Sequence, residues 1–266
     1  MRLLLALGIA LALDPSAIVE RATRALNSDW NADPTYACTE KDEVQKAGKT
    51  TSKTFEIVMI DGSDYRLPLA INDQPLPPEH HKNELIKLKA EVQRRGAESP
   101  ELRRKRVEAW KKQRDENGEL LLDFPNALAF QFVGEEVKDG HPAYAFSGTP
   151  KPGIVPVTRA QKVLTGIQGK AWVEKETLHP IRVECTVVKP VPVFGALASV
   201  LPGTDIEIGM TKVSPSTWLI ASVAMKLNVS KLHMIKSSEV TRSTYTTYRP
   251  NALALEELLS EANREN

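Results

Sequence analysis

The sequence has few of the residues that hold disulfide-rich or metal-dependent folds together. Only two of its 266 residues are cysteines, which excludes a disulfide-dense scaffold and a zinc site built from four cysteines. The sequence also lacks an excess of positive or negative charge. Lysine and arginine number 35 against 34 aspartate and glutamate residues, so the chain as a whole exerts no strong pull on nucleic acid or an anionic membrane. Any function based on charge must therefore be local.

Long apolar runs are missing too, since no stretch reaches the ~20 residues that a membrane-spanning helix needs. The longest run, Leu3–Leu13, follows Arg2 and contains the small-x-small pattern Ala10-Leu11-Ala12. These features predict a cleavable signal peptide over residues 1–12 and a periplasmic or secreted mature protein without a transmembrane segment. The other interpretation is the apolar start of a buried helix. No cysteine follows the run directly, so we expect no bacterial lipidation.

The two cysteines, Cys38 and Cys185, are far apart in the sequence. In an oxidising compartment they could form one disulfide bond. They could equally pack as two separate thiols, because free cysteine behaves as a small hydrophobic residue. The sequence leaves both interpretations open.

Hydrophobic periodicity predicts a mainly β chain with helices, an α+β fold with roughly nine or ten antiparallel strands. Helical spacing predicts an opening helix at 15–27 and a closing helix at 251–262. The charged segment 78–124 shows no β alternation and predicts a helical insert. Its two main helices should break near Gly96, with a short third segment at 120–124. No βαβ rhythm appears, so we expect no parallel sheet.

So many strands joined in sequence order should not stay flat, because each strand twists ~20–25° from its neighbour. We expect residues 13–266 to form a single domain, whose open antiparallel sheet curves strongly into an unclosed half-barrel. The apolar strand faces are then either core or the lining of a concave cavity. The candidate ligand-binding residues on these faces are Phe130, Phe132, Trp172, Ile206, Ile208, Trp218, Val223 and Met225.

A search for catalytic chemistry finds no specific motif. The adjacent histidines His80 and His81 would point about 100° apart on a helix, so they do not converge on a metal as an i, i+4 pair does. The chain lacks a G-x-S-x-G elbow, a P-loop and a G-x-G-x-x-G loop. We therefore expect no metal, no cofactor, no catalytic residue and no enzyme activity. A spatially assembled site that leaves no linear motif is the remaining enzyme hypothesis.

The helical insert carries the densest basic block of the chain, Arg103, Arg104, Lys105 and Arg106. One interpretation is a docking surface for an acidic protein partner or for lipid head groups. The other is a solvated helix, which the interspersed acidic residues favour. Nucleic-acid binding is not expected, because Trp110 is the only aromatic residue of the main helices of the insert.

Several motifs resemble the periplasmic outer-membrane lipoprotein-carrier and lipoprotein-sorting superfamily, whose members are LolA- or LolB-like. The main one is WVEKETLHPIRVE at 172–184, preceded by a hairpin, DGHPAY, at 139–144. Tyr65-Arg66-Leu67 and NDQPL at 72–76 resemble the segment before the helices in larger relatives. The chain departs from the carriers of this family mainly through its insert at 78–124.

The resemblance implies an open curved sheet around helices, with a concave apolar surface that holds acyl chains. It therefore implies a non-catalytic exported protein that binds a lipid, an acyl chain or a lipoprotein and serves envelope lipoprotein transport or sorting. The alternative is a regulatory or interaction module on the same scaffold, with a filled cavity and the basic insert as the surface for an envelope protein partner. No ligand contact of the family can be matched to a residue of this chain.

Overall fold

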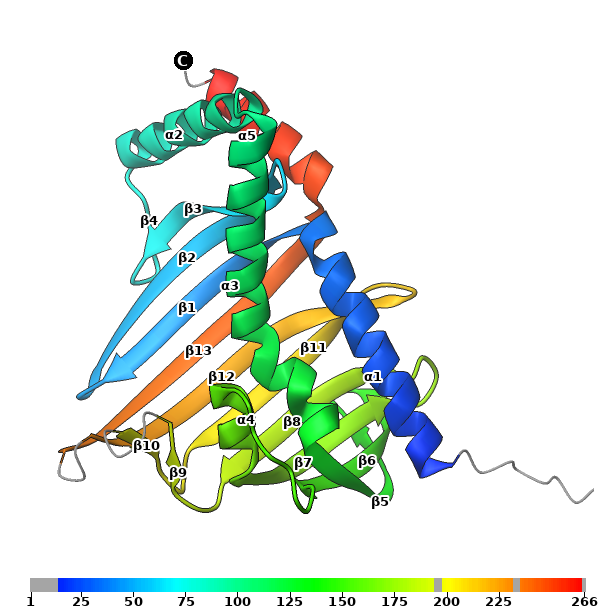
Figure 1. Ribbon diagram of the computed structural model, residues 1–266. Coiled ribbons are helices and arrows are strands. Elements are labelled where there is room, and N and C mark those ends of the chain that lie inside the picture. The colour runs from blue at the N-terminus through cyan, green and yellow to red at the C-terminus, as the bar shows by residue number, and fades with distance from the viewer. Residues whose placement is uncertain (1–13, 194–197, 232–234, 265–266) are drawn as a thin grey trace, which may run out of the picture.

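The computed structural model describes residues 14–193, 198–231 and 235–264 (Figure 1). The expected signal peptide, residues 1–12, lies outside the described residues. The helices are α1 (Pro15–Ala32), α2 (Pro78–Gly96), α3 (Pro100–Ala127), α4 (Arg159–Leu164) and α5 (Asn251–Arg264), with a short 3-10 helix η1 (Asp33–Thr35). The strands are β1 (Tyr36–Lys46), β2 (Lys49–Ile60), β3 (Ser63–Ile71), β4 (Gln74–Pro75), β5 (Leu128–Lys138), β6 (His141–Pro150), β7 (Ile167–Glu174), β8 (Pro180–Val187), β9 (Val191–Pro192), β10 (Ala198–Val200), β11 (Asp205–Ser214), β12 (Thr217–Lys231) and β13 (Ile235–Pro250).

All strand pairs in the described residues are antiparallel and belong to one sheet, in the order β4-β3-β2-β1-β13-β12-β11-β8-β7-β6-β5. The short strands β9 and β10 attach beside β12. The expectation of an antiparallel α+β fold is confirmed. The predicted strand number is too low, because β4, β9 and β10 are only two or three residues long and show no usable alternation.

The sheet is open, since β4 and β5 are its two edges. The expected curl into a half-barrel is wrong: the sheet is twisted, and α1 and α3 lie across one face (Figure 1). The reason lies at β1–β3, where helices cover both faces. Ala37, Val58 and Leu67 pack against α2 and α5, whereas their neighbours in sequence face α3. This end of the sheet therefore has no single inner side around which to curl.

The insert contains two long helices rather than three. The predicted break is confirmed: α2 ends at Gly96, and α3 begins at Pro100, where the Ser99 hydroxyl caps the helix by accepting from Leu102 N–H at 3.3 Å. The prediction of a separate short helix at 120–124 is wrong, because α3 continues through Gly118 to Ala127. The opening helix also runs five residues beyond the predicted end, to Ala32, and the short helix α4 was not predicted. None of the described helices combines the length and the apolar character needed to cross a bilayer.

The two cysteines are free and buried. Cys38 is on β1 and Cys185 on β8, four strand spacings apart in the sheet, which at ~4.8 Å per spacing places them ~19 Å apart. A disulfide bond needs Cα atoms within ~7 Å, so the interpretation as two buried thiols is correct. Burial raises the pKa of both thiols to about 12, and they are therefore uncharged at neutral pH.

The last turn of α2 is fixed to the sheet by a buried arginine. The guanidinium of Arg95 is only 6% exposed. It donates to the backbone oxygens of Ile60 (3.0 Å), Ser63 (2.9 Å) and Asp64 (3.1 Å), and it pairs with Glu91 at 2.6 Å. These bonds close the β2–β3 turn against the helix, and their acceptors would be left unsatisfied without the guanidinium.

We expect Arg95→Ala to lower the free energy of unfolding by about 3–5 kcal/mol. The change removes one partner of a buried ion pair and leaves several buried carbonyl oxygens without a hydrogen-bond donor. The matched control is Arg94→Ala. Arg94 is the adjacent, exposed residue and also pairs with Glu91, and its loss should cost at most about 1 kcal/mol. Urea unfolding of both variants measures the difference. Equal losses would show that the contacts of Arg95 with the β2–β3 turn contribute little.

Candidate functional site

The first candidate site is an apolar hollow between α1, the C-terminal half of α3 and strands β5–β8. Its only polar lining side chain is Thr23, whose hydroxyl donates to the Val19 carbonyl oxygen at 2.8 Å within the helix. The hollow therefore offers an incoming molecule no free polar partner from its described lining. It is lined by Val19, Ala22, Thr23, Leu26, Leu121, Phe124, Pro125, Phe130, Phe146, Ala171, Val173, Pro180 and Val183.

The hollow is small, with a volume of about 50 Å³. An apolar cavity of about 150 Å³ accommodates a molecule the size of benzene. An alkyl chain consequently does not fit unless α1 or α3 moves away from the sheet. The described structure is thus a closed form of the site.

Five of the eight candidate residues lie in one cluster on this inner face, together with Leu26, Leu121 and Phe124 of the two helices. Only one of the five lines the hollow itself. The others are core or partly buried residues beneath the helices. The five are Phe130, Ile206, Ile208, Val223 and Met225.

The remaining three candidates lie elsewhere. Trp172 alternates along β7 with Ala171 and Val173, which line the hollow, so its ring faces the other side of the sheet. There its N–H donates to Glu136. Trp218 belongs to the same cluster as Trp172, and it also lines a narrow hollow beneath α1 together with Leu26. Phe132 is on the edge strand β5, 40% exposed, with its ring 5.7 Å from that of Phe146.

A second compartment lies farther along the inner face, between the N-terminal half of α3 and strands β1–β3, β12 and β13. This cleft has a volume of about 300 Å³ and adjoins a groove of about 610 Å³ through four shared lining residues, among them Trp110 and Arg114. Unlike the apolar hollow, it is lined by aromatic and charged side chains. Its aromatic residues are Trp30, Tyr36, Trp110, Tyr245 and Tyr248, and its charged residues are Asp33, Glu40, Asp64, Arg66 and Arg114.

Arg114 joins α3 to α1 at the mouth of the cleft. Its guanidinium stacks on the Trp30 ring at 3.8 Å, donates to the Trp30 carbonyl and pairs with Asp33 at 3.2 Å. Gly118, one turn farther along α3, makes room for the same ring, because a Cβ there would collide with Trp30. This explains a glycine inside a long helix, where alanine would otherwise be favoured by ~1 kcal/mol.

Arg66 also lines the cleft and, like Arg114, contacts both acidic and aromatic side chains. It pairs with Glu40 at 2.9 Å and Asp42 at 2.7 Å, and it lies 4.3 Å above the Phe55 ring. Burial raises the pKa of Glu40, although Arg66 opposes the shift. Burial and the neighbouring carboxylates also raise the pKa of Tyr245.

A narrow third hollow of about 30 Å³ connects the two compartments. It shares Leu26 and Leu121 with the apolar hollow, and Trp30, Asp33 and Ile220 with the cleft. The inner face thus carries one track beneath α1 and α3, apolar at one end and polar at the other.

The C-terminal half of α1 is anchored by a buried carboxylate. Asp29 is 4% exposed, lies 3.5 Å from Nε2 of His179 and accepts the backbone N–H of Trp218. Burial raises the pKa of Asp29 to about 6, while the charge of His179 and the Trp218 hydrogen bond oppose this shift. In the N-terminal half of α1, by contrast, the Asp14 carboxylate accepts from Ser16, and Glu20 pairs with Arg24 along the helix.

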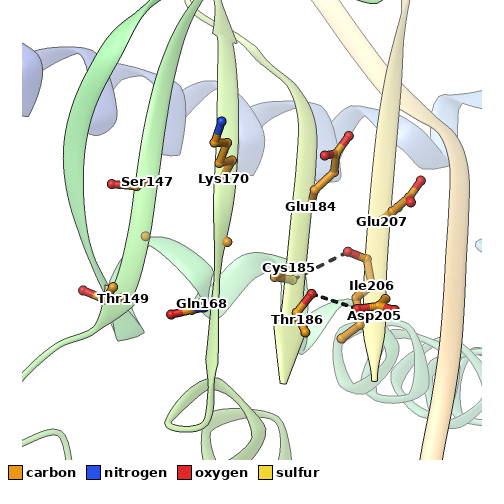
Figure 2. A pocket seen from close by; sticks show the side chains of 12 residues that line it. Ser147, Thr149, Gln168, Lys170, Glu184, Cys185, Thr186, Asp205, Ile206 and Glu207 are labelled. Atoms are coloured by element: carbon orange, nitrogen blue, oxygen red, sulfur yellow. Dashed lines mark hydrogen bonds between the residues drawn. The ribbon is translucent and has the colours of Figure 1, made fainter. Parts of the chain in front are cut away.

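The opposite face of the sheet has a depression of about 460 Å³ across β6, β7, β8 and β11 (Figure 2). Its carboxylates are already engaged by neighbouring side chains. Glu184 pairs with Lys138 at 2.6 Å, Thr186 donates to Asp205 at 2.8 Å, and Glu207 pairs with Arg182 at 2.8 Å. Within the part of the chain that the structure describes, no group of three or more histidine, cysteine or acidic side chains could hold a metal ion.

The basic block on α3 is neutralised by its own neighbours. Arg103 lies 3.6 Å from Asp61, and Arg106 pairs with the Glu98 carboxylate at 2.8 Å. Arg104 and Lys105 pair along the helix with Glu108 and Glu101. This arrangement agrees with the interpretation as a solvated helix.

Sequence reasoning missed the polar cleft. Its lining comes from eight elements, including α1, α3 and strands from both ends of the chain, and no local pattern links them. Trp110, Cys38 and Arg66 were noted in the sequence, but none of them as part of a shared site.

No family model and no curated protein sequence matches the chain. Among solved structures, it is similar to a DUF1329 family protein from Desulfovibrio piger, with 14% identity, a TM-score of 0.38 and coverage of 89% of this chain and 92% of that chain. An outer-membrane lipoprotein-sorting protein domain from Vibrio parahaemolyticus, of the family that the motifs resemble, matches with 11% identity, a TM-score of 0.36 and coverage of 93% and 100%. A chain of the Pseudomonas aeruginosa MucA/MucB complex matches with 11% identity, a TM-score of 0.25 and coverage of 86% and 98%. These values are low, so none of the matches assigns a ligand or a partner to this chain.

The anchor of α1 predicts a specific pH dependence. Between pH 4 and 6 the unfolded chain ionises Asp29 while the folded chain keeps it protonated, so folding stability falls as the pH rises through this window. The Asp29→Asn side chain cannot ionise. When the pH is raised from 4 to 7, we expect the free energy of unfolding of this variant to increase by about 2–3 kcal/mol relative to that of the parent protein. Urea unfolding at both pH values measures this gain. Glu20→Gln, an exposed change on the same helix, should show none. If the free energies of unfolding of Asp29→Asn and the parent differ by the same amount at pH 4 and pH 7, the raised pKa of Asp29 is contradicted.

Proposed function

We propose that the chain is an exported, non-catalytic protein that binds the alkyl or acyl chain of a lipid or lipoprotein in the apolar hollow. The observation that supports this proposal is the lining of the hollow, which offers an incoming molecule apolar surface and no free polar group. Ligand sites of this kind bind chiefly through burial of apolar area. The expected role in envelope transport or sorting belongs to the same proposal.

Opening of the hollow requires α1 to leave the sheet, and the contacts of α1 indicate which end moves. Its N-terminal half is held by apolar side chains, Ile18 and Ala22, which pack against Phe146 and Val173. Its C-terminal half is tied to other elements by Asp29 and by the Arg114–Trp30 stack. We therefore propose that the N-terminal half swings away while the C-terminal half stays in place.

The energetics favour exchange of one apolar contact for another. Each methylene group that a ligand buries contributes ~0.8 kcal/mol, so eight buried methylenes would contribute about 6 kcal/mol. The ligand would cover the strand surface that Ile18 and Ala22 leave, so the apolar area newly exposed to water is limited to these two helix side chains where they do not pack against the ligand. Tight binding then needs no polar contact at this end of the track.

The alternative, an interaction module that uses the basic block of α3, has less support. Its exposed cations are already paired with acidic side chains, and a partner would have to replace those pairs. Exposed ion pairs contribute at most ~1 kcal/mol each, so such a partner would gain little beyond what is already present.

We expect Ala171→Val to weaken alkyl-chain binding about tenfold. The change adds two methyl groups at the wall of the hollow, displacing about two ligand methylenes worth ~1.6 kcal/mol. Valine suits a strand, so the fold should be retained. The measurement is displacement of the neutral fluorescent probe N-phenyl-1-naphthylamine by 1-dodecanol.

The matched control is Lys170→Val, the adjacent position on β7, whose exposed side chain lies on the opposite face. It should leave dodecanol affinity unchanged. Equal affinities of the parent, Ala171→Val and Lys170→Val proteins would place the bound chain outside the hollow. A parent protein that binds neither probe nor alcohol would contradict the proposed function altogether.

A further inference from the structure

We infer that the aromatic cleft under α3 receives the polar head of the bound amphiphile and selects a cationic head, an amine or a quaternary ammonium group. This inference rests on the proposed function, because the apolar hollow would hold the tail of the same molecule. It names the chemical class of ligand, which the hollow alone leaves open.

The first support is the continuity of the track. The intermediate hollow shares lining residues with both compartments. Phe124 lines the apolar end and Trp110 the polar end of α3, and fourteen residues of helix at 1.5 Å each separate them by ~21 Å. A single extended amphiphile along the helix would have its tail and head in different surroundings, provided that the side chains of Leu26 and Leu121 move apart to widen the intermediate hollow of about 30 Å³.

The second support is the chemistry of the cleft. Aromatic faces carry a negative quadrupole that attracts cations, and several of them around a buried space are the usual receptor for ammonium groups. The cleft supplies rings from Trp30, Trp110, Tyr245 and Tyr248, together with Tyr36, which meets Tyr248 edge-on at 6.5 Å. It also carries more carboxylates than guanidinium groups: Asp33, Glu40 and Asp64 against Arg66 and Arg114.

The third support is that both guanidinium groups of the cleft are already engaged. Arg114 has Asp33 and the Trp30 carbonyl, and Arg66 has two carboxylates. An anionic head would have to break these pairs. Asp64, by contrast, has no side-chain ion pair or hydrogen bond to any described residue, although its carboxylate lies close enough to raise the pKa of Glu40. It is the carboxylate most available to a ligand cation.

The ionisation of Cys38 agrees with a negative potential in the cleft. Its thiol lines the cleft, and its pKa is raised to about 12 by burial first and then by the charges of Asp33, Glu40 and Glu56. Burial disfavours a charge of either sign, but the part of the shift that comes from the three carboxylates disfavours an anion and favours a cation in the same place.

The test compares three ligands with the same tail and different heads: dodecyltrimethylammonium, 1-dodecanol and dodecanoate, each below its micelle-forming concentration. All three compete with N-phenyl-1-naphthylamine on the full mature chain. We expect the ammonium compound to bind about tenfold more tightly than dodecanoate, as an aromatic and carboxylate site implies, with dodecanol between them.

Two variants assign the preference to the cleft. Asp64→Asn should reduce the advantage of the ammonium head over dodecanol at least threefold, and Trp110→Leu, which keeps apolar bulk, should do the same. Dodecanol affinity should fall less than that of the ammonium compound, because the alcohol head carries no charge for these residues to attract. Glu108→Gln, an exposed carboxylate on α3 outside the cleft, is the matched control and should change nothing.

The outcomes separate the inference from the proposed function. Equal binding of all three ligands, or tighter binding of dodecanoate, would overturn the cationic preference while leaving the apolar hollow in place. A preference that survives Asp64→Asn and Trp110→Leu unchanged would place the head outside the cleft. Failure of all three ligands to displace the probe would remove the proposed function itself.

Discussion

The structure depends on the burial of one apolar face of an open sheet. Ile206, Ile208 and Val183 lie on that face and are almost fully covered, yet the sheet has two free edges and does not close over them. The cover comes from α1 and α3, two helices laid across the strands (Figure 1). A cover made of separate helices can be moved, whereas a closed barrel cannot. The contacts that stabilise the fold are therefore the same contacts that an alkyl ligand would replace.

The two covering helices, α1 and α3, are attached to the rest of the fold at different places. α3 bridges the whole inner face from β3 to the apolar hollow, and its N-terminal part is fixed by Arg106, which donates to Ser63 and pairs with Glu98. α1 is fixed mainly at its C-terminal end, through Asp29 and Trp30. Under the proposed function, such an asymmetry would give the site a fixed polar end and a movable apolar end. This is the arrangement that an amphiphile with a recognised head and an interchangeable tail would require.

The secondary structure could be predicted where it depends on residues close together in the sequence. Helical spacing predicted that α1 and α5 begin at residues 15 and 251, and the break between α2 and α3 was predicted near Gly96. The continuity of α3 through Gly118 could not be predicted, because it depends on Trp30, 88 residues earlier in the chain. The shape of the sheet was missed for a similar reason. It depends on which face of β1–β3 receives α2 and α5, and this is a tertiary choice.

The candidate site was predicted only in part. Period-two alternation identified apolar faces but could not distinguish covered core, such as Ile206, from the wall of a hollow, such as Phe130. It also placed Trp172 among the candidates although its neighbours face the hollow and it does not. The polar cleft corresponds to no linear motif, since Trp30, Asp64 and Tyr245 come from three distant segments.

The most direct test of this account is a nuclear Overhauser measurement between an alkyl ligand and methyl-labelled protein. The account predicts contacts from the methylene groups of bound dodecanol to the methyl groups of Leu26, Leu121 and Val183, accompanied by loss of the contacts between Ala22 of α1 and Val173 of β7. Ligand contacts confined to the exposed surface, with every contact between α1 and the sheet retained, would contradict it.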